Sequence, residues 1–220
     1  TATATDPAVV SGGSTTITLT GYTGTIQWYS STDGVSYTIM AGETAATVGT
    51  GNLTVDMWYR ATVTSGLCSP ANSSVATVTV RPNDATWDGG GANDNTLTDA
   101  NWVGDLYPQT GASSVMRFAG ATRLTPSVTH AVDSAFGSIY FNSGASAFTL
   151  SGNAMTIHSL IRNDSSNLQT VNNALALGAG VTANAASGNL ALGGVISGAN
   201  SLTKAGSGTL TLSGANTFSA

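Results

Sequence analysis

The most informative stretch of the chain is Leu202-Thr203-Lys204-Ala205-Gly206-Ser207-Gly208-Thr209-Leu210-Thr211-Leu212-Ser213-Gly214-Ala215-Asn216-Thr217-Phe218. Within it, apolar and polar residues alternate over 209–212 and the alternation stops at a Ser-Gly pair, which is the pattern of a short β-strand followed by a turn. Similar sequence occurs upstream at 148–152, 168–173 and 189–194. The turns after these strands begin at 151, 172, 193 and 213, so the unit repeats every 20 or 21 residues.

A single copy of this repeat cannot bury its own apolar face. Copies stacked at the ~4.8 Å spacing of hydrogen-bonded strands place one apolar side chain over the next and pair each backbone with its neighbours. The sequence therefore predicts a right-handed parallel β-helix over 113–220, with coils of 20–21 residues. We expect Leu150, Leu192 and Leu212 to point inward at equivalent positions, with Val171 in the same column.

The sequence at 202–218 also resembles the autotransporter-associated β-strand repeat of large secreted bacterial surface proteins. The resemblance implies a parallel β-helix passenger that lies outside the cell or on the bacterial cell surface. It implies no reaction, because that family is defined by its architecture.

The composition disfavours two classes of partner. Only 8% of the 220 residues are charged, and six Lys and Arg stand against eleven Asp and Glu, for a net charge of −5. Nucleic-acid binding depends on clustered basic side chains, and polybasic attachment to a membrane surface does so too. No apolar run approaches the ~20 residues needed to span a bilayer. We therefore expect neither a nucleic-acid partner nor insertion into a membrane.

Residues 1–82 have a different pattern, which predicts a β-sandwich. Gly-, Asn- and Asp-containing turns separate short alternating segments, and Trp28 supplies a central aromatic residue that faces the alternation at 59–63. We expect strands at 15–20, 25–30, 37–40, 57–65 and 74–80.

Two stretches of this first unit, 24–34 and 58–68, resemble immunoglobulin-like modules of bacterial cell-surface proteins. Such modules often carry a second cysteine where this chain has Val9-Val10-Ser11-Gly12, so the resemblance implies no disulfide here. Because no histidine or basic residue lies near it in sequence, Cys68 is expected to be an unreactive, buried or partly buried thiol. Modules of this kind usually serve as spacers or assembly elements.

Residues 83–112 are rich in tryptophan and aspartate, and they resemble the segment that opens such β-strand-repeat regions. A β-helix needs a cap, since its first coil exposes apolar core and unpaired backbone, and Trp87 and Trp102 are expected to cover it. Two alternatives remain open. Asp88, Asp94 and Asp99 are a weak candidate Ca²⁺ site, because calcium binds carboxylate oxygens, and the two tryptophans are a candidate glycan platform.

No catalytic constellation is apparent, and we expect no enzyme, no cofactor and no metal beyond the calcium alternative. Ser201 and Lys204 have the Ser-x-x-Lys spacing but lie inside the repeat, without the other motifs of serine acylases. His130 and His158 fit no metal-binding pattern and are expected at the surface or in turns.

The end of the predicted β-helix is expected to take part in assembly. The edge at Thr209, Leu210, Thr211 and Leu212 has no covering charge or proline between 206 and 220, so further coils or another copy of the chain should cover it. An extended segment such as Thr1-Ala2-Thr3-Ala4-Thr5 is a candidate for that covering strand. The sequence thus favours a structural subunit of a surface fibre, sheath or stalk, with an adhesin or a module that binds surface glycan as the alternative.

Overall fold

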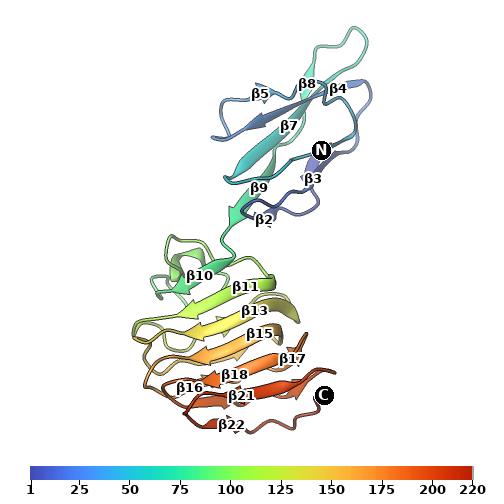
Figure 1. The fold of residues 1–220 in the computed structure, drawn as a ribbon. Helices are drawn as coiled ribbons and strands as arrows, with labels where there is room; N and C mark the ends of the chain where they lie inside the picture. The colour runs from blue at the N-terminus through green and yellow to red at the C-terminus, as the bar shows by residue number, and fades with distance from the viewer. Residues whose placement is uncertain (220) are drawn as a thin grey trace. The chain divides into compact units, whose positions relative to one another are not determined.

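The computed structural model describes residues 1–219, and these are almost entirely β-strand and turn (Figure 1). The chain divides after Arg81 into two compact units, each with its own hydrophobic core. Strand β9 of the first unit ends at that residue, and β10 of the second begins at Asp84.

The described residues of the first unit form two sheets. One has the strand order β1-β3-β6, and the other has the order β2-β9-β7-β4-β5, with β8 added beside β7. All neighbours are antiparallel except β2 and β9, which are parallel. The strands are β1 (Ala2–Ala4), β2 (Ala8–Val10), β3 (Thr16–Leu19), β4 (Thr25–Ser31), β5 (Thr38–Ile39), β6 (Thr47–Gly49), β7 (Met57–Thr64), β8 (Ala71–Asn72) and β9 (Ala76–Arg81).

Alternate residues of these strands build the core of the first unit. Trp28 is fully buried, as expected, and its indole Nε1 donates a hydrogen bond to the Ala45 carbonyl at 2.9 Å. Tyr59 and Ala61 face it from β7, and Ile17 lies in the same core from β3. The period-two pattern therefore places the apolar half of each strand inward.

Residues 1–5, the candidate covering strand for an open β-helix end, already have a partner strand in their own unit. Strand β1 pairs antiparallel with β3, with Ala2 opposite Leu19 and Ala4 opposite Ile17, and Ala2 is buried. The alternating alanines are small enough to pack on the core of their own unit, where the edge of β3 is available to them.

The turn after β4 is closed by the Asp33 carboxylate. It accepts hydrogen bonds from the backbone N–H groups of Ser36 at 2.7 Å and Val35 at 2.8 Å, and from the Ser31 hydroxyl at 2.8 Å. These donors stabilise the ionised form and lower the pKa of Asp33 from 3.8 to about 2.

We predict that this turn gives the first unit an acid-sensitive contribution to stability. The contribution is complete above the unfolded pKa of 3.8 and is lost as the pH falls through about 2. Asp33→Asn should therefore lower the urea midpoint near neutral pH, and the difference from the native chain should shrink between those two pH values. The NMR signal of the Trp28 indole N–H reports on this unit. A difference in urea midpoint between the two chains that stays constant over this pH range would contradict the prediction.

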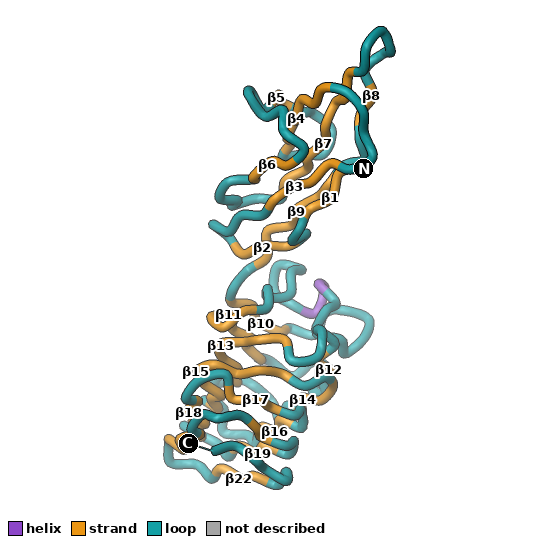
Figure 2. The backbone as a smooth tube through the Cα atoms, turned by 90° about the vertical axis from the view of Figure 1, so that its right-hand side faces the viewer, coloured by secondary structure: helices purple, strands orange, loops and turns teal. Residues whose placement is uncertain are grey.

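The second unit is a β-solenoid of stacked parallel strands (Figures 1 and 2). Its described residues form one sheet that contains β10, β11, β13, β15, β17, β18, β20 and β21 and a second with the order β12-β14-β16-β19-β22. The strands are β10 (Asp84–Trp87), β11 (Gly111–Phe118), β12 (Ser127–Val128), β13 (Ser134–Phe141), β14 (Thr149–Gly152), β15 (Met155–Asn163), β16 (Gln169–Val171), β17 (Leu175–Leu177), β18 (Val181–Ala185), β19 (Leu190–Leu192), β20 (Ile196–Ser197), β21 (Leu202–Ala205) and β22 (Leu210–Leu212), with a 3-10 helix η1 (Asp99–Asn101) between β10 and β11.

The predicted apolar column is confirmed. In the pairing of β14, β16, β19 and β22, Leu150 lies beside Val171, Val171 beside Leu192, and Leu192 beside Leu212. The first three side chains are at most 1% exposed, whereas Leu212, in the last coil, is 38% exposed. The repeat of 20 or 21 residues read from the sequence is therefore the length of chain in one coil.

Buried amide side chains connect the corners of successive coils. Asn163 is fully buried, and its Nδ2 donates to the carbonyls of Asn167 at 2.8 Å and Asn189 at 2.9 Å. Gln169, also fully buried, accepts from the Phe148 N–H at 2.8 Å and donates to the Ser146 carbonyl at 2.7 Å. These bonds satisfy backbone groups that the turns leave outside the strand ladders.

Candidate functional site

The two tryptophans of residues 83–112 lie in the core and are not a glycan platform. Trp87 and Trp102 are both 0% exposed, and their rings meet edge to face with centroids 5.4 Å apart. Each also lies 6.1 Å from the ring of Phe118, in β11. The indole Nε1 of Trp102 donates to the Thr96 carbonyl at 2.9 Å. Large apolar surfaces pack where they can exclude water, so these rings cover the first coil and present no face to a sugar.

The structure does not bring the three candidate calcium ligands together. The carboxylate of Asp88 accepts from the Gly90 N–H at 3.0 Å, and that of Asp99 accepts from the Tyr107 N–H at 3.0 Å. Asp94 accepts from the Thr125 hydroxyl at 2.8 Å and pairs with Arg123 at 3.1 Å, and these contacts lower its pKa. Within residues 1–219 no three His, Cys, Asp or Glu side chains gather as a metal site would require.

His130 lies in the connection between β12 and β13, as expected, but it is not at the surface, and the expectation of a buried or partly buried Cys68 is wrong. His130 is buried, with its ring nitrogen 3.1 Å from the Thr96 hydroxyl and its ring edge to face with Tyr107 and Phe136. The residues that surround it come from other coils and from residues 83–112, so the sequence next to His130 could not indicate its burial. Cys68 is exposed in the turn between β7 and β8, beside a fully exposed leucine. His158 is half-buried, on β15.

The charged groups of the solenoid are largely paired with one another. Arg117 forms a two-pronged contact with Asp84 and lies 4.4 Å above the ring of Tyr140. Arg162 contacts Asp164 at 2.7 Å, two residues away. No helix in the part of the chain that the structure describes has the length and apolarity of a membrane span.

The last coil is paired on one side only in the described residues. Strand β21 pairs with β18, and β22 pairs with β19. The chain beyond β22 continues along the preceding coil, where the N–H of Thr217 donates to the Ile196 carbonyl at 2.8 Å and Phe218 packs against the core. The end of the core is thus partly covered by the chain itself, while Leu212 stays 38% exposed.

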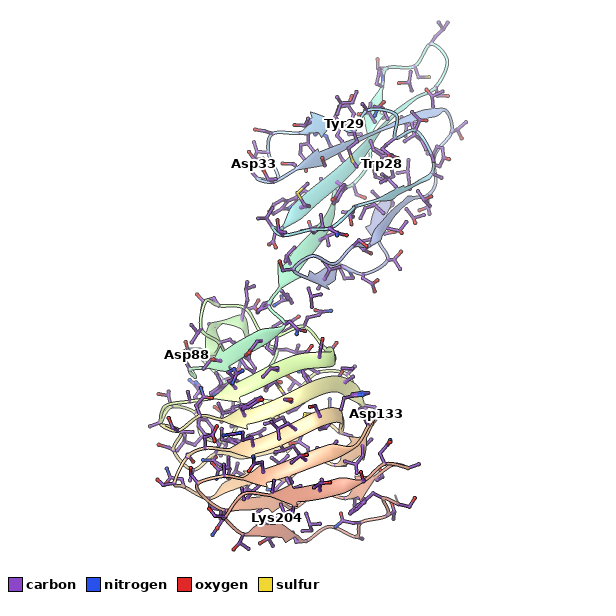
Figure 3. All side chains as sticks on the ribbon, viewed as in Figure 1. Trp28, Tyr29, Asp33, Asp88, Asp133 and Lys204 are labelled. Carbon is purple, nitrogen blue, oxygen red and sulfur yellow. The ribbon has the colours of Figure 1, made fainter. Side chains whose placement is uncertain are left out.

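Lys204 occupies a core position in the last coil. In the sheet, Ile161 pairs with Ala183 and Ala183 pairs with Lys204, and the first two of these residues are buried. The Lys204 side chain itself is exposed (Figure 3). Its Nζ donates a hydrogen bond to the Gly206 carbonyl. A charge at an inward position is one way in which natural sheets protect an open edge. The edge at β22 has no such charge.

The outer surface of the larger sheet in the first unit carries a cluster that the sequence analysis missed. We define this aromatic face as Tyr29, Tyr37, Ile39, Trp58 and Arg60. Tyr29 follows the buried Trp28 in β4 (Figure 3). In the strand register it lies opposite both Arg60 of β7 and Ile39 of β5. The Arg60 guanidinium lies 4.0 Å above the centre of the Tyr37 ring. The signal was present as aromatic and basic residues at the outward positions of two alternating strands.

Two family models match parts of the chain. Residues 1–82 match a domain of unknown function, DUF8696, which coincides closely with the first unit. Residues 202–220 match the passenger-associated-transport-repeat, and this match begins where β21 begins. No curated protein matches the chain, and no solved structure does. The similarity at 202–220 is therefore to a repeat of passenger proteins, and it lies on the final coil of a β-solenoid.

Proposed function

We propose that the chain is an architectural segment of an exported bacterial surface protein, forming part of an extracellular fibre, sheath or stalk. One observation and one general property of stacked repeats support this role. The repeat that it shares with passenger proteins lies on a parallel β-solenoid, which is the architecture that such a repeat implies. The solenoid also gains stability by adding like units to its end, as a growing structural element does.

We infer that the first unit is an immunoglobulin-like sandwich. In that fold the first, second, fourth and fifth strands lie in one sheet and the third, sixth and seventh in the other, to which variable-type modules add strands beside the third. Here β1, β3 and β6 share one sheet, β4, β7 and β9 are neighbours in the other, and β5 pairs with β4 at the place of such an added strand. A buried tryptophan on β4 packs between the sheets, in keeping with the same fold. This unit would act as a spacer.

The observation that carries the assembly role is the one-sided pairing of β22. Leu210 and Leu212 continue the buried column of the preceding coils, yet Leu212 is 38% exposed. A strand added at this edge, from another copy of the chain or from further coils of the same polypeptide, would bury that column and pair the free backbone. Addition by copies would be head to tail and would produce a filament.

We predict that self-association depends on the inward positions of β22. Leu212→Lys should keep the chain folded, since the lysine remains in water, but should block the addition of a strand at β22, because that strand would bury the charge. Thr211→Lys adds the same charge on the outward, exposed side of the same strand and is the matched control. Light scattering over a wide range of concentration should show growth for the native chain and for Thr211→Lys only.

A native chain that stays monomeric at every concentration would overturn assembly by copies. Equal growth of both lysine variants would show that association occurs elsewhere on the molecule. Electron microscopy of the same samples would distinguish filaments from amorphous aggregates.

We assign the chain no reaction, no cofactor and no metal. The arginines of the solenoid are held in ion pairs with Asp84, Asp94 and Asp164, and Asp88 and Asp99 accept backbone hydrogen bonds in separate turns. An adhesin that binds a surface glycan remains the second candidate. It is favoured by the aromatic face of the first unit and not by the tryptophans of the cap.

A further inference from the structure

We propose that the aromatic face of the first unit binds a glycan through a carboxylate-bearing sugar, with Arg60 as the group that recognises the carboxylate. This inference does not depend on the architectural role proposed above. It concerns a different unit and a different kind of partner from the edge at β22.

The strand register places the members of this face side by side. Tyr29 lies directly opposite Arg60 on one side and Ile39 on the other. Directly opposite residues of antiparallel strands point to the same face of the sheet, so these three form a row across β5, β4 and β7. Trp58 precedes Arg60 by two residues in β7 and shares that face. The buried Tyr59 between them points into the core.

Arg60 is a cation without an acidic partner. The arginines at 117, 123 and 162 are each paired with an aspartate, but the Arg60 guanidinium contacts the Tyr37 ring and forms no ion pair or side-chain hydrogen bond within the described residues. The Asp33 carboxylate, in the turn after β4, is bonded within its own turn. A guanidinium is a planar fork that matches a carboxylate in two-pronged contact, so charge complementarity indicates that chemistry.

Two shielded polar atoms mark the same place. Arg60 Nε and the Tyr37 hydroxyl are closed off from solvent, and neither has a hydrogen-bond partner in the part of the chain that the structure describes. A buried polar atom without a partner is costly, and natural proteins keep few of them. Because Nε is closed off, an incoming carboxylate would reach it only with a shift of the side chains that cover it, and would then supply the missing acceptor.

The remaining residues suit the ring of a sugar. Tyr29, Tyr37 and Trp58 are half-buried, and Ile39 is 54% exposed at the border of the face. Aromatic side chains combine a large apolar surface with a polar edge, and the C–H face of a sugar ring stacks on such a surface. A protein partner would need a far larger area, roughly 20–30 residues on each side, than these five residues provide.

The test compares matched pairs of oligosaccharides by titration calorimetry. Sialyllactose and lactose differ by one carboxylated sugar. Trigalacturonate is a trimer of uronic acids, and maltotriose is a neutral trimer that differs from it also in the configuration at C4. We expect the native chain to bind at least one acidic member and not its neutral counterpart. The acidic member that binds identifies whether the carboxylate belongs to a sialic or a uronic acid.

Variants then locate the site. Arg60→Gln should weaken binding by about tenfold or more, since it removes a charge-assisted contact. The affinity of Arg60→Lys should lie between those of the native chain and Arg60→Gln, because lysine keeps the charge but lacks the planar fork of the guanidinium. Arg162→Gln, a change in an ion-paired arginine of the other unit, is the control and should bind like the native chain. Circular dichroism checks that each variant is folded.

Three outcomes would overturn the proposal. Neither acidic oligosaccharide binds at millimolar concentration, or the neutral members bind equally well, or a folded Arg60→Gln variant binds as the native chain does. None of them bears on assembly at β22, which light scattering measures separately.

Discussion

Aspartate in place of Leu192 should unfold several coils of the solenoid together and lower its thermal midpoint by more than about 10 °C. Leu192 is 1% exposed and lies between Val171 and Leu212 in the apolar column. Losing a buried leucine costs roughly 2–5 kcal/mol, and an unpaired buried carboxylate adds to that cost. Each kcal/mol lowers the midpoint of a unit of this size by roughly 2–4 °C.

The comparison variant for this experiment is Ala191→Asp. Residue 191 is the neighbour of Leu192 in β19, on the outward side of the strand and only half-buried, so its carboxylate can stay in water. Circular dichroism would give both midpoints, and amide exchange would show which coils open. Because coils are stabilised by their neighbours, exchange should rise from β16 to β22 in Leu192→Asp alone. Equal midpoints would mean that the register of the column is wrong.

Removing the indole of Trp102 should destabilise the start of the solenoid by about 3–5 kcal/mol, the range measured for large aromatic residues replaced by alanine. Trp102→Ala would leave a cavity against Trp87 and Phe118 and would deprive the Thr96 carbonyl of its donor. The first coil would then have water on one side of its core. We expect residues 84–118 to exchange their amide protons faster, while the later coils change less.

Leu97→Ala is the matched control for that experiment. It shortens another apolar side chain of the same segment, but one that is 40% exposed and outside the core cluster. Hydrogen exchange followed by mass spectrometry would compare both variants with the native chain. If the amides of β10 and β11 are as well protected from exchange in Trp102→Ala as in Leu97→Ala, the tryptophans do not act as a cap.

The sequence supported the solenoid more firmly than any site on it. The column of Leu150, Val171, Leu192 and Leu212 could be read directly, because inward positions recur at a constant step. The short strands β2, β6 and β8 of the first unit were missed. They are two or three residues each, too short for an alternating pattern to be distinguished from a turn.

Sites were predicted less well because they depend on which distant residues meet. Asp88, Asp94 and Asp99 are close in sequence, yet each carboxylate serves a separate loop. The glycan alternative was placed on the two tryptophans that the structure buries completely. The aromatic face remained hidden, since Tyr29 and Arg60 are 31 residues apart in the chain and meet only when β4 pairs with β7.

The sequence by itself determined the local pattern: strand, turn, and the 20- to 21-residue step at which inward leucines recur. It could do so because side-chain alternation and turn preference depend on residues close together in the chain. Only the tertiary structure decided that residues 2–4 pair with β3, that His130 is buried and that Lys204 stands in a core register. Burial and pairing are set by whichever surface excludes water from a residue, and that surface comes from segments far away in sequence.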